Sequence, residues 1–136
     1  MSWVMRNRMH QIDLFRKYPH QVQEEWLQKL IKNAEKTDFG QQYGFDNIQK
    51  YEQFKTQIPI STYEDLEDSI KSIRQGLQNI LWPSETKWFA KSSGTSGSKS
   101  KFIPVTEESL IDCHFKGGKD MLSIYCENYP ETTIFN

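Results

Sequence analysis

The feature that most constrains the fold is a short polar loop between two strand-like runs, in the stretch FAKSSGTSGSKSKFIPV from Phe89 to Val105. Aromatic, partly alternating residues precede the loop and FIPV follows it, so both flanks are typical of short strands. Pro104 lacks a backbone donor, which confines the second strand to a sheet edge or a strand end. A loop held at both ends has a fixed shape, and we predict that it joins two strands.

Two helices are predicted at the start of the chain. From Met5 the apolar residues recur at helical spacing, and Pro19, a residue favoured in the first turn of a helix, marks the start of the second. The second helix is expected to end before TDFGQQYGF, where Gly40 and Gly44 supply turns. Its apolar face, which must pack on other residues, consists of Val22, Trp26, Leu30, Ile31 and Ala34.

The segment IPISTYEDLEDSIKSIRQG predicts the best-defined helix. Ser61 and Glu64 have the spacing of a capping box, and Gly76 lies where a left-handed cap belongs. The expected buried stripe consists of Leu66, Ile70, Ile73 and Leu77.

A last helix is predicted after the loop. Thr106 has the side chain to cap a helix that begins EESLIDCHFKGG, and Gly117 and Gly118 permit close backbone packing there. The chain then reaches ETTIFN, a β-prone segment whose backbone groups need a neighbouring strand.

The composition is that of a folded chain that is part of something larger. Only 36% of the residues are hydrophobic and the mean hydropathy is -0.75, which is low for a domain that must bury enough apolar surface to offset its chain entropy. We predict an α+β fold in a single incomplete domain over residues 1–136. Residues 1–84 are expected to be mainly helical, and residues 85–136 to contain strand, loop, strand and helix.

Charge and cysteine content restrict the possible partners. A net charge of -1 and a pI of about 6.3 give no general reason to bind nucleic acid or an anionic membrane, so any anion site must be local. The apolar runs are too short for a secretion signal or a membrane span, which predicts a cytoplasmic protein. Cys113 and Cys126 fit neither a disulfide framework nor a zinc site and are expected to be reduced, buried thiols.

The loop has the composition of an anion-binding site. A Gly-rich turn points consecutive backbone N–H groups into one concavity, hydroxyl groups add donors and lysine adds charge, a combination that suits a polyphosphate. The turns come from Gly94 and Gly97, the hydroxyl groups from Ser92, Ser93, Thr95 and Ser96, and the charge from Lys99 and Lys101. Neither the Walker loop nor the dinucleotide fingerprint matches, because Lys99 follows Ser98 and the loop enters a strand.

The segment SSGTSGSKSKFIP resembles the phosphate-binding signature of adenylate-forming enzymes, whose core matches Ser92 to Gly97. The closer resemblance is to the auxin-responsive promoter family, the Gretchen Hagen type acyl acid amido synthetases. In that family the signature lysine comes four residues after the last core glycine, at the place of Lys101, whereas many acyl-CoA synthetases have it where Ser100 lies. TDFGQQYGFDNI, IPISTYEDLEDSI and HFKGGKDML are also similar to segments of bacterial members, so the resemblance covers nearly the whole chain.

The resemblance implies a two-step reaction on small-molecule substrates. A carboxylic acid attacks the α-phosphate of ATP, which Mg2+ accompanies, to give an acyl adenylate, and an amine then takes the acyl group. The residues implied to bind the phosphates of ATP are Ser92, Ser93, Gly94, Thr95, Ser96, Gly97 and Lys101. Family members also need an acyl pocket and a mobile C-terminal domain, so we expect an N-terminal fragment that is inactive alone. The acid, the amine and the oligomeric state stay open.

Two other hypotheses remain. The chain is alternatively a noncatalytic phosphate- or nucleotide-binding module, or a helical interaction protein whose Ser-rich loop is a linker. The remaining motifs have plain interpretations. We expect a turn at the DFG of residues 38–40, exposed side chains at Lys116 and Lys119 rather than a second anion site, structural or surface roles for His10, His20 and His114, and core positions for Trp26, Trp82, Trp88, Tyr43 and Tyr51.

Overall fold

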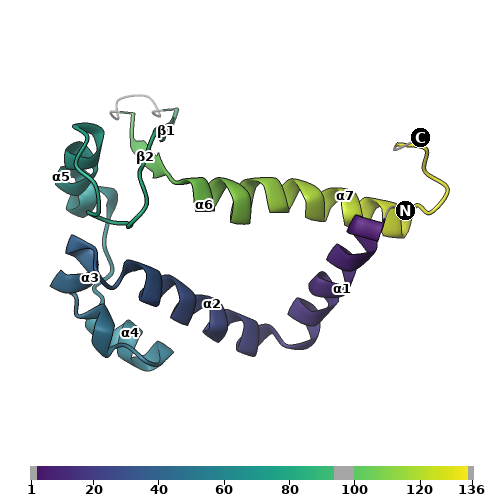
Figure 1. The fold of residues 1–136 in the computed structure, drawn as a ribbon, viewed down its shortest axis with the longest axis horizontal. Coiled ribbons are helices and arrows are strands. Elements are labelled where there is room, and N and C mark those ends of the chain that lie inside the picture. The colour runs from purple at the N-terminus through teal and green to yellow at the C-terminus, as the bar shows by residue number, and fades with distance from the viewer. Residues whose placement is uncertain (1–2, 94–99, 135–136) are drawn as a thin grey trace. The chain divides into compact units, whose positions relative to one another are not determined.

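The computed structural model describes residues 3–93 and 100–134 and has the predicted α+β fold. In this part of the chain, helices precede a two-stranded sheet and a further helical segment follows it (Figure 1). The helices before the sheet are α1 (Trp3–Lys17), α2 (Pro19–Ala34), α3 (Asp38–Gln42), the 3-10 turn η1 (Phe45–Asn47), α4 (Tyr51–Gln57) and α5 (Tyr63–Arg74). The sheet pairs β1 (Trp88–Lys91) with β2 (Phe102–Val105), and after it come α6 (Glu107–Ser109), the π-helical segment η2 (Leu110–Phe115) and α7 (Lys116–Asn128).

The chain divides into two compact units, which are described one at a time. Unit 1 consists of Met1–Gln23 and Glu108–Asn136, and unit 2 consists of Glu24–Glu107. Both predicted N-terminal helices are present, and the second begins at Pro19 as expected. The larger domain predicted to include residues 1–136 stays a prediction.

The core of unit 2 forms around the end of α2. Ile31 and Ala34 on α2 are each 4% exposed, Phe45 is 8% exposed and Ile48 is 3% exposed. Burial of a large apolar side chain contributes about 1.5–3 kcal/mol, so this cluster fixes the predicted apolar face of α2. Leu30 was expected on the same face but is 46% exposed. The side chains that pack around the cluster are Leu27, Phe39, Tyr43, Phe54, Ile58 and Trp82.

The aromatic residues expected in the core divide into two groups. Tyr43 and Trp82 pack against the core cluster, as predicted, and Trp26 is half-buried. The prediction is wrong for Tyr51 and Trp88, which are 53% and 50% exposed. Both are the first residue of a short element, α4 and β1, where the chain enters from an exposed connection.

The segment after α2 continues into a short helix rather than the predicted turn. Thr37 is fully buried, and its hydroxyl donates to the Ala34 carbonyl at 2.7 Å and accepts from the Gly40 N–H at 3.0 Å, so it caps α3. Gly40 lies inside α3, where an added Cβ would be 2.0 Å from the Ala34 oxygen. Gly44, with φ of 57°, does form the predicted turn.

Helix α5 begins one residue later than predicted. Thr62 is the N-cap, and the Asp65 carboxylate accepts a hydrogen bond from the Thr62 N–H at 2.7 Å. The capping box therefore joins Thr62 to Asp65 and not Ser61 to Glu64. Glu64 is therefore not the capping-box partner, although its carboxylate hydrogen-bonds within the first turn, to its own N–H and to the Thr62 side chain.

At the end of α5 the predicted cap at Gly76 is confirmed, whereas the predicted burial of Leu77 is wrong. Gly76 has φ of 98°, the left-handed conformation expected there. Ile70 and Ile73 are each 5% exposed and confirm the buried stripe. Leu77 is 54% exposed because it lies beyond the cap, where the helical spacing no longer applies.

The predicted strands form an antiparallel hairpin around the loop. Trp88 lies opposite Val105 and Lys91 lies opposite Phe102. Pro104 belongs to β2 and pairs with Phe89, in keeping with the predicted edge position.

In unit 1, α1 lies against α7 (Figure 1). An ion pair between Arg8, which is buried, and Asp120, which is partly buried, joins the two helices. The Arg8 guanidinium donates from Nε to one oxygen of the Asp120 carboxylate and from Nη2 to the other at 2.8 Å. Its Nη1 donates to Gln11 Oε1 at 2.8 Å, so Arg8, which is 8% exposed, is well satisfied. Met5, Ser123 and Cys126 are buried in the same unit.

Two expectations about the last helix are wrong. A Cβ added at Gly117 or Gly118 would meet no atom within 4 Å among the described residues, so these glycines allow no close packing within that part of the chain. Cys113, in the π-helical segment, is exposed, whereas Cys126 is buried as predicted. Residues 131–134 form no strand, and the pairing expected for ETTIFN stays a prediction. None of the helices in the described ranges combines the length and apolar character that a membrane span requires.

Candidate functional site

The hairpin holds the two ends of the predicted anion-binding loop together. One step beyond the Lys91–Phe102 pair, the Ser92 N–H donates to the Lys101 carbonyl at 2.9 Å. In return, the Lys101 N–H donates to Ser92 Oγ at 3.0 Å. These reciprocal bonds, here called the loop stem, close the loop at its base. The hydroxyl of Ser92 accepts in this arrangement, and a hydroxyl that accepts still has one hydrogen that it can donate.

The loop stem joins the first and last of the predicted phosphate-binding residues. Ser92 is half-buried and Ser93 is exposed. Lys101, nine residues after Ser92, is half-buried at the other end. The other predicted residues, Gly94, Thr95, Ser96 and Gly97, lie outside the described residues, as does Lys99. The tertiary structure therefore brings Ser92 and Lys101 together and leaves the middle of the predicted site untested.

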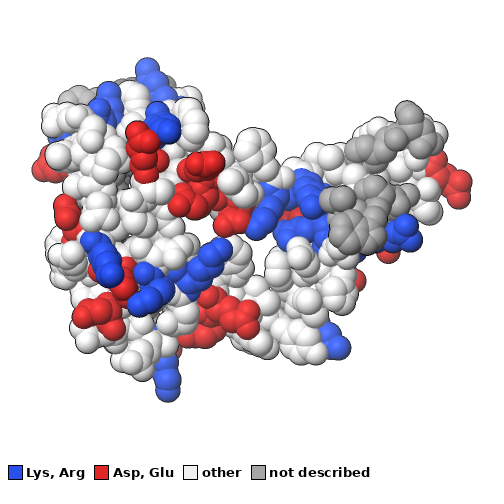
Figure 2. Space-filling view, in the orientation of Figure 1, with Lys and Arg blue, Asp and Glu red and all other residues white. Residues whose placement is uncertain are grey.

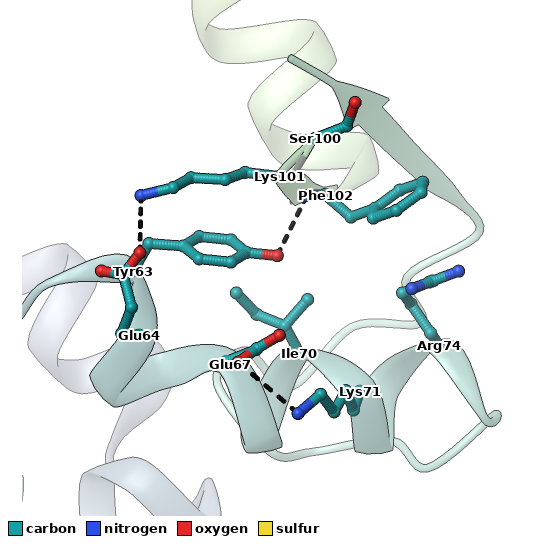
Figure 3. Close-up of a pocket in the computed structure, with 9 residues that line it drawn as sticks. All are labelled: Tyr63, Glu64, Glu67, Ile70, Lys71, Arg74, Ser100, Lys101 and Phe102. Carbon is teal, nitrogen blue, oxygen red and sulfur yellow. Dashed lines mark hydrogen bonds and ion pairs between the residues drawn. The ribbon is translucent and has the colours of Figure 1, made fainter. Parts of the chain in front are cut away.

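The first turn of α5 determines where the Lys101 side chain lies. The Lys101 ammonium group is 2.9 Å from the Glu64 carboxylate and 4.9 Å from the centroid of the Tyr63 ring. The Tyr63 hydroxyl accepts a hydrogen bond from the Phe102 N–H at 3.0 Å. Two adjacent residues of α5 thus contact both the backbone and the side chain at the end of the loop (Figure 3).

These contacts form one wall of an open pocket of about 430 Å³. Ser100 and Lys101 line it directly after the loop, and Phe102 lines it from β2 (Figure 3). The remaining lining residues lie along α5 and are Tyr63, Glu64, Glu67, Ile70, Lys71 and Arg74. The pocket thus lies beside the end of the loop, between α5 and β2.

The pocket carries charges of both signs. Lys71 and Arg74 add positive charge to that of Lys101, and the Arg74 guanidinium lies 3.9 Å from the centroid of the Phe102 ring. Glu67 is 3.5 Å from Lys71 and offsets part of this charge. Basic and acidic side chains are also interleaved over the molecular face shown in Figure 2. Any anion-binding site at this pocket is therefore local, as expected for a chain with a net charge of -1.

The contact with Lys101 lowers the pKa of the Glu64 carboxyl group. The hydrogen bond from Lys101 lowers the pKa of Glu64 below its ordinary value of 4.5, and a backbone hydrogen bond lowers it further. Near neutral pH Glu64 therefore carries a full negative charge next to the Lys101 ammonium group.

The other candidate motifs do not add a second site. The DFG at residues 38–40 forms the start of α3. Lys116 forms an ion pair with Asp112, and Lys119 is exposed as expected. Within residues 3–93 and 100–134, His, Cys, Asp and Glu side chains form no cluster of three that could hold a metal ion.

Sequence reasoning missed the residues that hold Lys101. It placed Glu64 in a capping box and gave Tyr63 no role. The contacts join residues 37 or more positions apart, and a single sequence carries no periodic signal for such pairs. In the structure Asp65, and not Glu64, is the capping-box partner, and Glu64 pairs with Lys101.

Comparisons with known proteins support the family that the loop and its flanking segments resemble. The GH3 family N-terminal domain matches residues 8–134. A jasmonoyl–L-amino acid synthetase from Nicotiana attenuata is 36% identical over 103 residues, which are 75% of this chain and 18% of the relative. An indole-3-acetic acid-amido synthetase from Arabidopsis thaliana is 33% identical over 93 residues, which are 68% of this chain and 17% of the relative.

The chain therefore spans less than a fifth of the length of these two relatives. The match to the GH3 family N-terminal domain, over residues 8–134, includes both strands, the segment between them and helices on either side. The chain belongs to the GH3 family of acyl acid amido synthetases.

Proposed function

We propose that this chain is the nucleotide phosphate-binding portion of an ATP-dependent ligase that forms an acyl adenylate and joins a carboxylic acid to an amine. The observation that carries the proposal is the loop stem, in which Ser92 and Lys101 close the signature loop of a GH3 family chain. The relatives are named for joining jasmonate or indole-3-acetic acid to amino acids, so small carboxylic acids are the expected substrate class.

The residues at the stem fit the phosphate groups of ATP. The Lys101 ammonium group supplies positive charge, and the Ser92 hydroxyl keeps a hydrogen to donate. Ser93, Gly94, Thr95, Ser96 and Gly97 complete the proposed site with backbone N–H and hydroxyl donors. Mg2+ is expected to arrive with the nucleotide, because Mg2+ is commonly held by substrate phosphates with few protein ligands.

The proposed role of these groups is electrostatic. Donors fixed around the β- and γ-phosphates stabilise negative charge as pyrophosphate leaves the α-phosphate. The loop stem fixes the backbone of Ser92 and Lys101 at the two ends of the loop, which reduces the ordering cost of binding. The acyl pocket and the groups that hold adenine are assigned to the rest of the full-length protein. A cytoplasmic location is part of the same proposal.

Titration of Mg-ATP into the chain, followed by calorimetry, tests phosphate binding. Lys101→Ala is expected to weaken binding about tenfold, because a hydrogen bond to a charged group contributes about 1.5 kcal/mol or more. Lys87→Ala is the matched control, since Lys87 is also a lysine in an ion pair, 3.1 Å from Glu85, and lies outside the proposed site. Equal affinities for the two variants would contradict the proposed site.

Exchange of labelled pyrophosphate into ATP tests the ligase assignment. The complete gene product is expected to catalyse this exchange only when a suitable carboxylic acid is present, and Lys101→Ala is expected to slow it. A complete gene product that binds Mg-ATP but exchanges no pyrophosphate with any of a panel of carboxylic acids would instead identify a noncatalytic nucleotide-binding module.

A further inference from the structure

The lysine of the proposed phosphate site already has an anionic partner. Lys101 Nζ lies 2.9 Å from the Glu64 carboxylate, and the Lys101 side chain passes over the Tyr63 ring, as Figure 3 shows. The carboxylate and the ring therefore occupy one hydrogen-bonding direction and one face of the ammonium group. An incoming phosphate oxygen must share Lys101 with Glu64 or displace it.

The exposure of the pair makes exchange feasible. The Lys101 side chain is 42% exposed and that of Glu64 is 67% exposed. Exposed ion pairs are weak, because water and salt screen them and both side chains are flexible. A polyphosphate carries more charge than one carboxylate and meets several donors at once, so it competes well for the same ammonium group.

The backbone contact is independent of that exchange. The bond from the Phe102 N–H to the Tyr63 hydroxyl, at 3.0 Å, ties β2 to α5 without using the Lys101 side chain. The end of the loop thus stays in place while the ammonium group changes partners.

We infer that Glu64 is an internal competitor of the phosphate groups: it holds Lys101 when the site is empty and releases it when polyphosphate binds. This inference rests on the proposed function, because it assumes that Lys101 binds phosphate. Glu64 would then lower the affinity of the site for polyphosphate. Tyr63 would position the backbone of Phe102 both in the empty site and in the occupied one.

Affinity measurements with Mg-ATP and with inorganic tripolyphosphate test the inference. Glu64→Gln is expected to bind both probes about fivefold more tightly than the unsubstituted chain, the gain from removing one exposed competing ion pair. Glu67→Gln is the matched control, since Glu67 lines the same pocket but lies 3.5 Å from Lys71. Its affinity is expected to change less than twofold.

A double-mutant cycle shows whether the gain acts through Lys101. In a Lys101→Ala background, Glu64→Gln is expected to give no gain, because the competing pair is already absent. Carbon NMR of the Glu64 carboxyl group gives a second readout. Its lowered pKa is expected to rise toward the ordinary value both in Lys101→Ala and when tripolyphosphate saturates the unsubstituted chain.

The outcomes separate this inference from the proposed function. If Lys101→Ala weakens binding but Glu64→Gln does not strengthen it, or strengthens it equally in the Lys101→Ala background, Glu64 is not a competitor and the proposed site stands. If binding does not depend on Lys101, both are overturned. Circular dichroism of each variant confirms that the helices are intact.

Discussion

The ion pairs Arg8–Asp120 in unit 1 and Lys101–Glu64 in unit 2 contrast in burial and geometry. The Arg8 and Asp120 side chains are 9% and 29% exposed, and two nitrogens of the guanidinium meet two oxygens of the carboxylate. Lys101 and Glu64 are 42% and 67% exposed, and one ammonium group meets one carboxylate oxygen. The first pair joins two helices of unit 1, whereas the second lies at the end of the candidate loop.

This difference separates a structural pair from an exchangeable one. Removal of one partner from a buried pair leaves the other charge without water or a counterion, which is strongly unfavourable. Removal of one partner from an exposed pair leaves the other to water, at little cost. Arg8–Asp120 therefore suits the attachment of α1 to α7, and Lys101–Glu64 suits a site where one anion replaces another.

The largest effect is expected from breaking the buried pair. Asp120→Ala leaves the Arg8 guanidinium without a carboxylate partner, with Gln11 Oε1 and the Phe15 ring as its other described contacts, and it should lower the free energy of unfolding by about 3 kcal/mol. Urea unfolding measures the change. Asp13→Ala is the control, because the Asp13–Arg16 pair of α1 is 3.6 Å long with side chains 63% and 79% exposed. A loss below about 1 kcal/mol for Asp120→Ala would mean that the Arg8–Asp120 pair contributes no more than an exposed ion pair does.

Acid should remove the same contribution in the unsubstituted chain. The hydrogen bond from Arg8 lowers the pKa of Asp120 below its ordinary value of 3.8. The folded-state pKa is the lower one, so the stabilisation is present above pH 3.8 and is lost as pH falls through the depressed value. Unfolding curves at several pH values should show this loss, and Asp120→Asn should lack that part of it. Parallel curves for the two proteins would argue against the lowered pKa.

A smaller effect is expected at the positioning residue of unit 2. Tyr63→Phe keeps the ring beside Lys101 but removes the acceptor for the Phe102 N–H, at a cost of about 1 kcal/mol. Hydrogen exchange at the Phe102 amide should become faster. The exposed Tyr51, at the start of α4, offers Tyr51→Phe as a control with no expected change at that amide. Unchanged protection of Phe102 in Tyr63→Phe would show that β2 is held by other contacts.

The smallest effect on stability is expected at the exposed pair itself. Glu64→Gln should leave the midpoint of urea unfolding unchanged within error, because both side chains remain solvated. The same variant is expected to raise affinity for tripolyphosphate. A clear loss of stability would mean that Glu64 holds the fold and would make its exchange with phosphate unfavourable.

The elements and the loop boundaries were predictable because they depend on local patterns. Pro19 starts α2, Gly76 ends α5, and the segments on either side of the loop are strands. Predictions failed where a neighbour far along the chain decides. The Asp38 and Phe39 N–H groups, at the start of α3, donate to the Asn79 and Ile80 carbonyls, which no local pattern indicates. Trp88 is 50% exposed, although its aromatic side chain indicated a core position.

The candidate site was predictable only in part, for the same reason. Its residue types and spacing follow from one continuous segment, which is enough to indicate a phosphate-binding loop. The partners of Lys101 were not predictable, because Glu64 and Tyr63 belong to α5 and lie 37 and 38 positions before Lys101 along the chain. The sequence analysis assigned Glu64 to a capping box with Ser61, whereas the helix is capped by Thr62 and Asp65.

The sequence by itself determined the α+β order of elements, the loop between two strands and the family resemblance. These depend on turn chemistry, apolar spacing and a continuous motif, all of which are local. The tertiary structure alone decided that Ser92 meets Lys101, that Glu64 neutralises Lys101 and that Arg8 is buried against Asp120. Such contacts join distant residues, and their free energy depends on burial and on water exclusion, which exist only once the chain has folded.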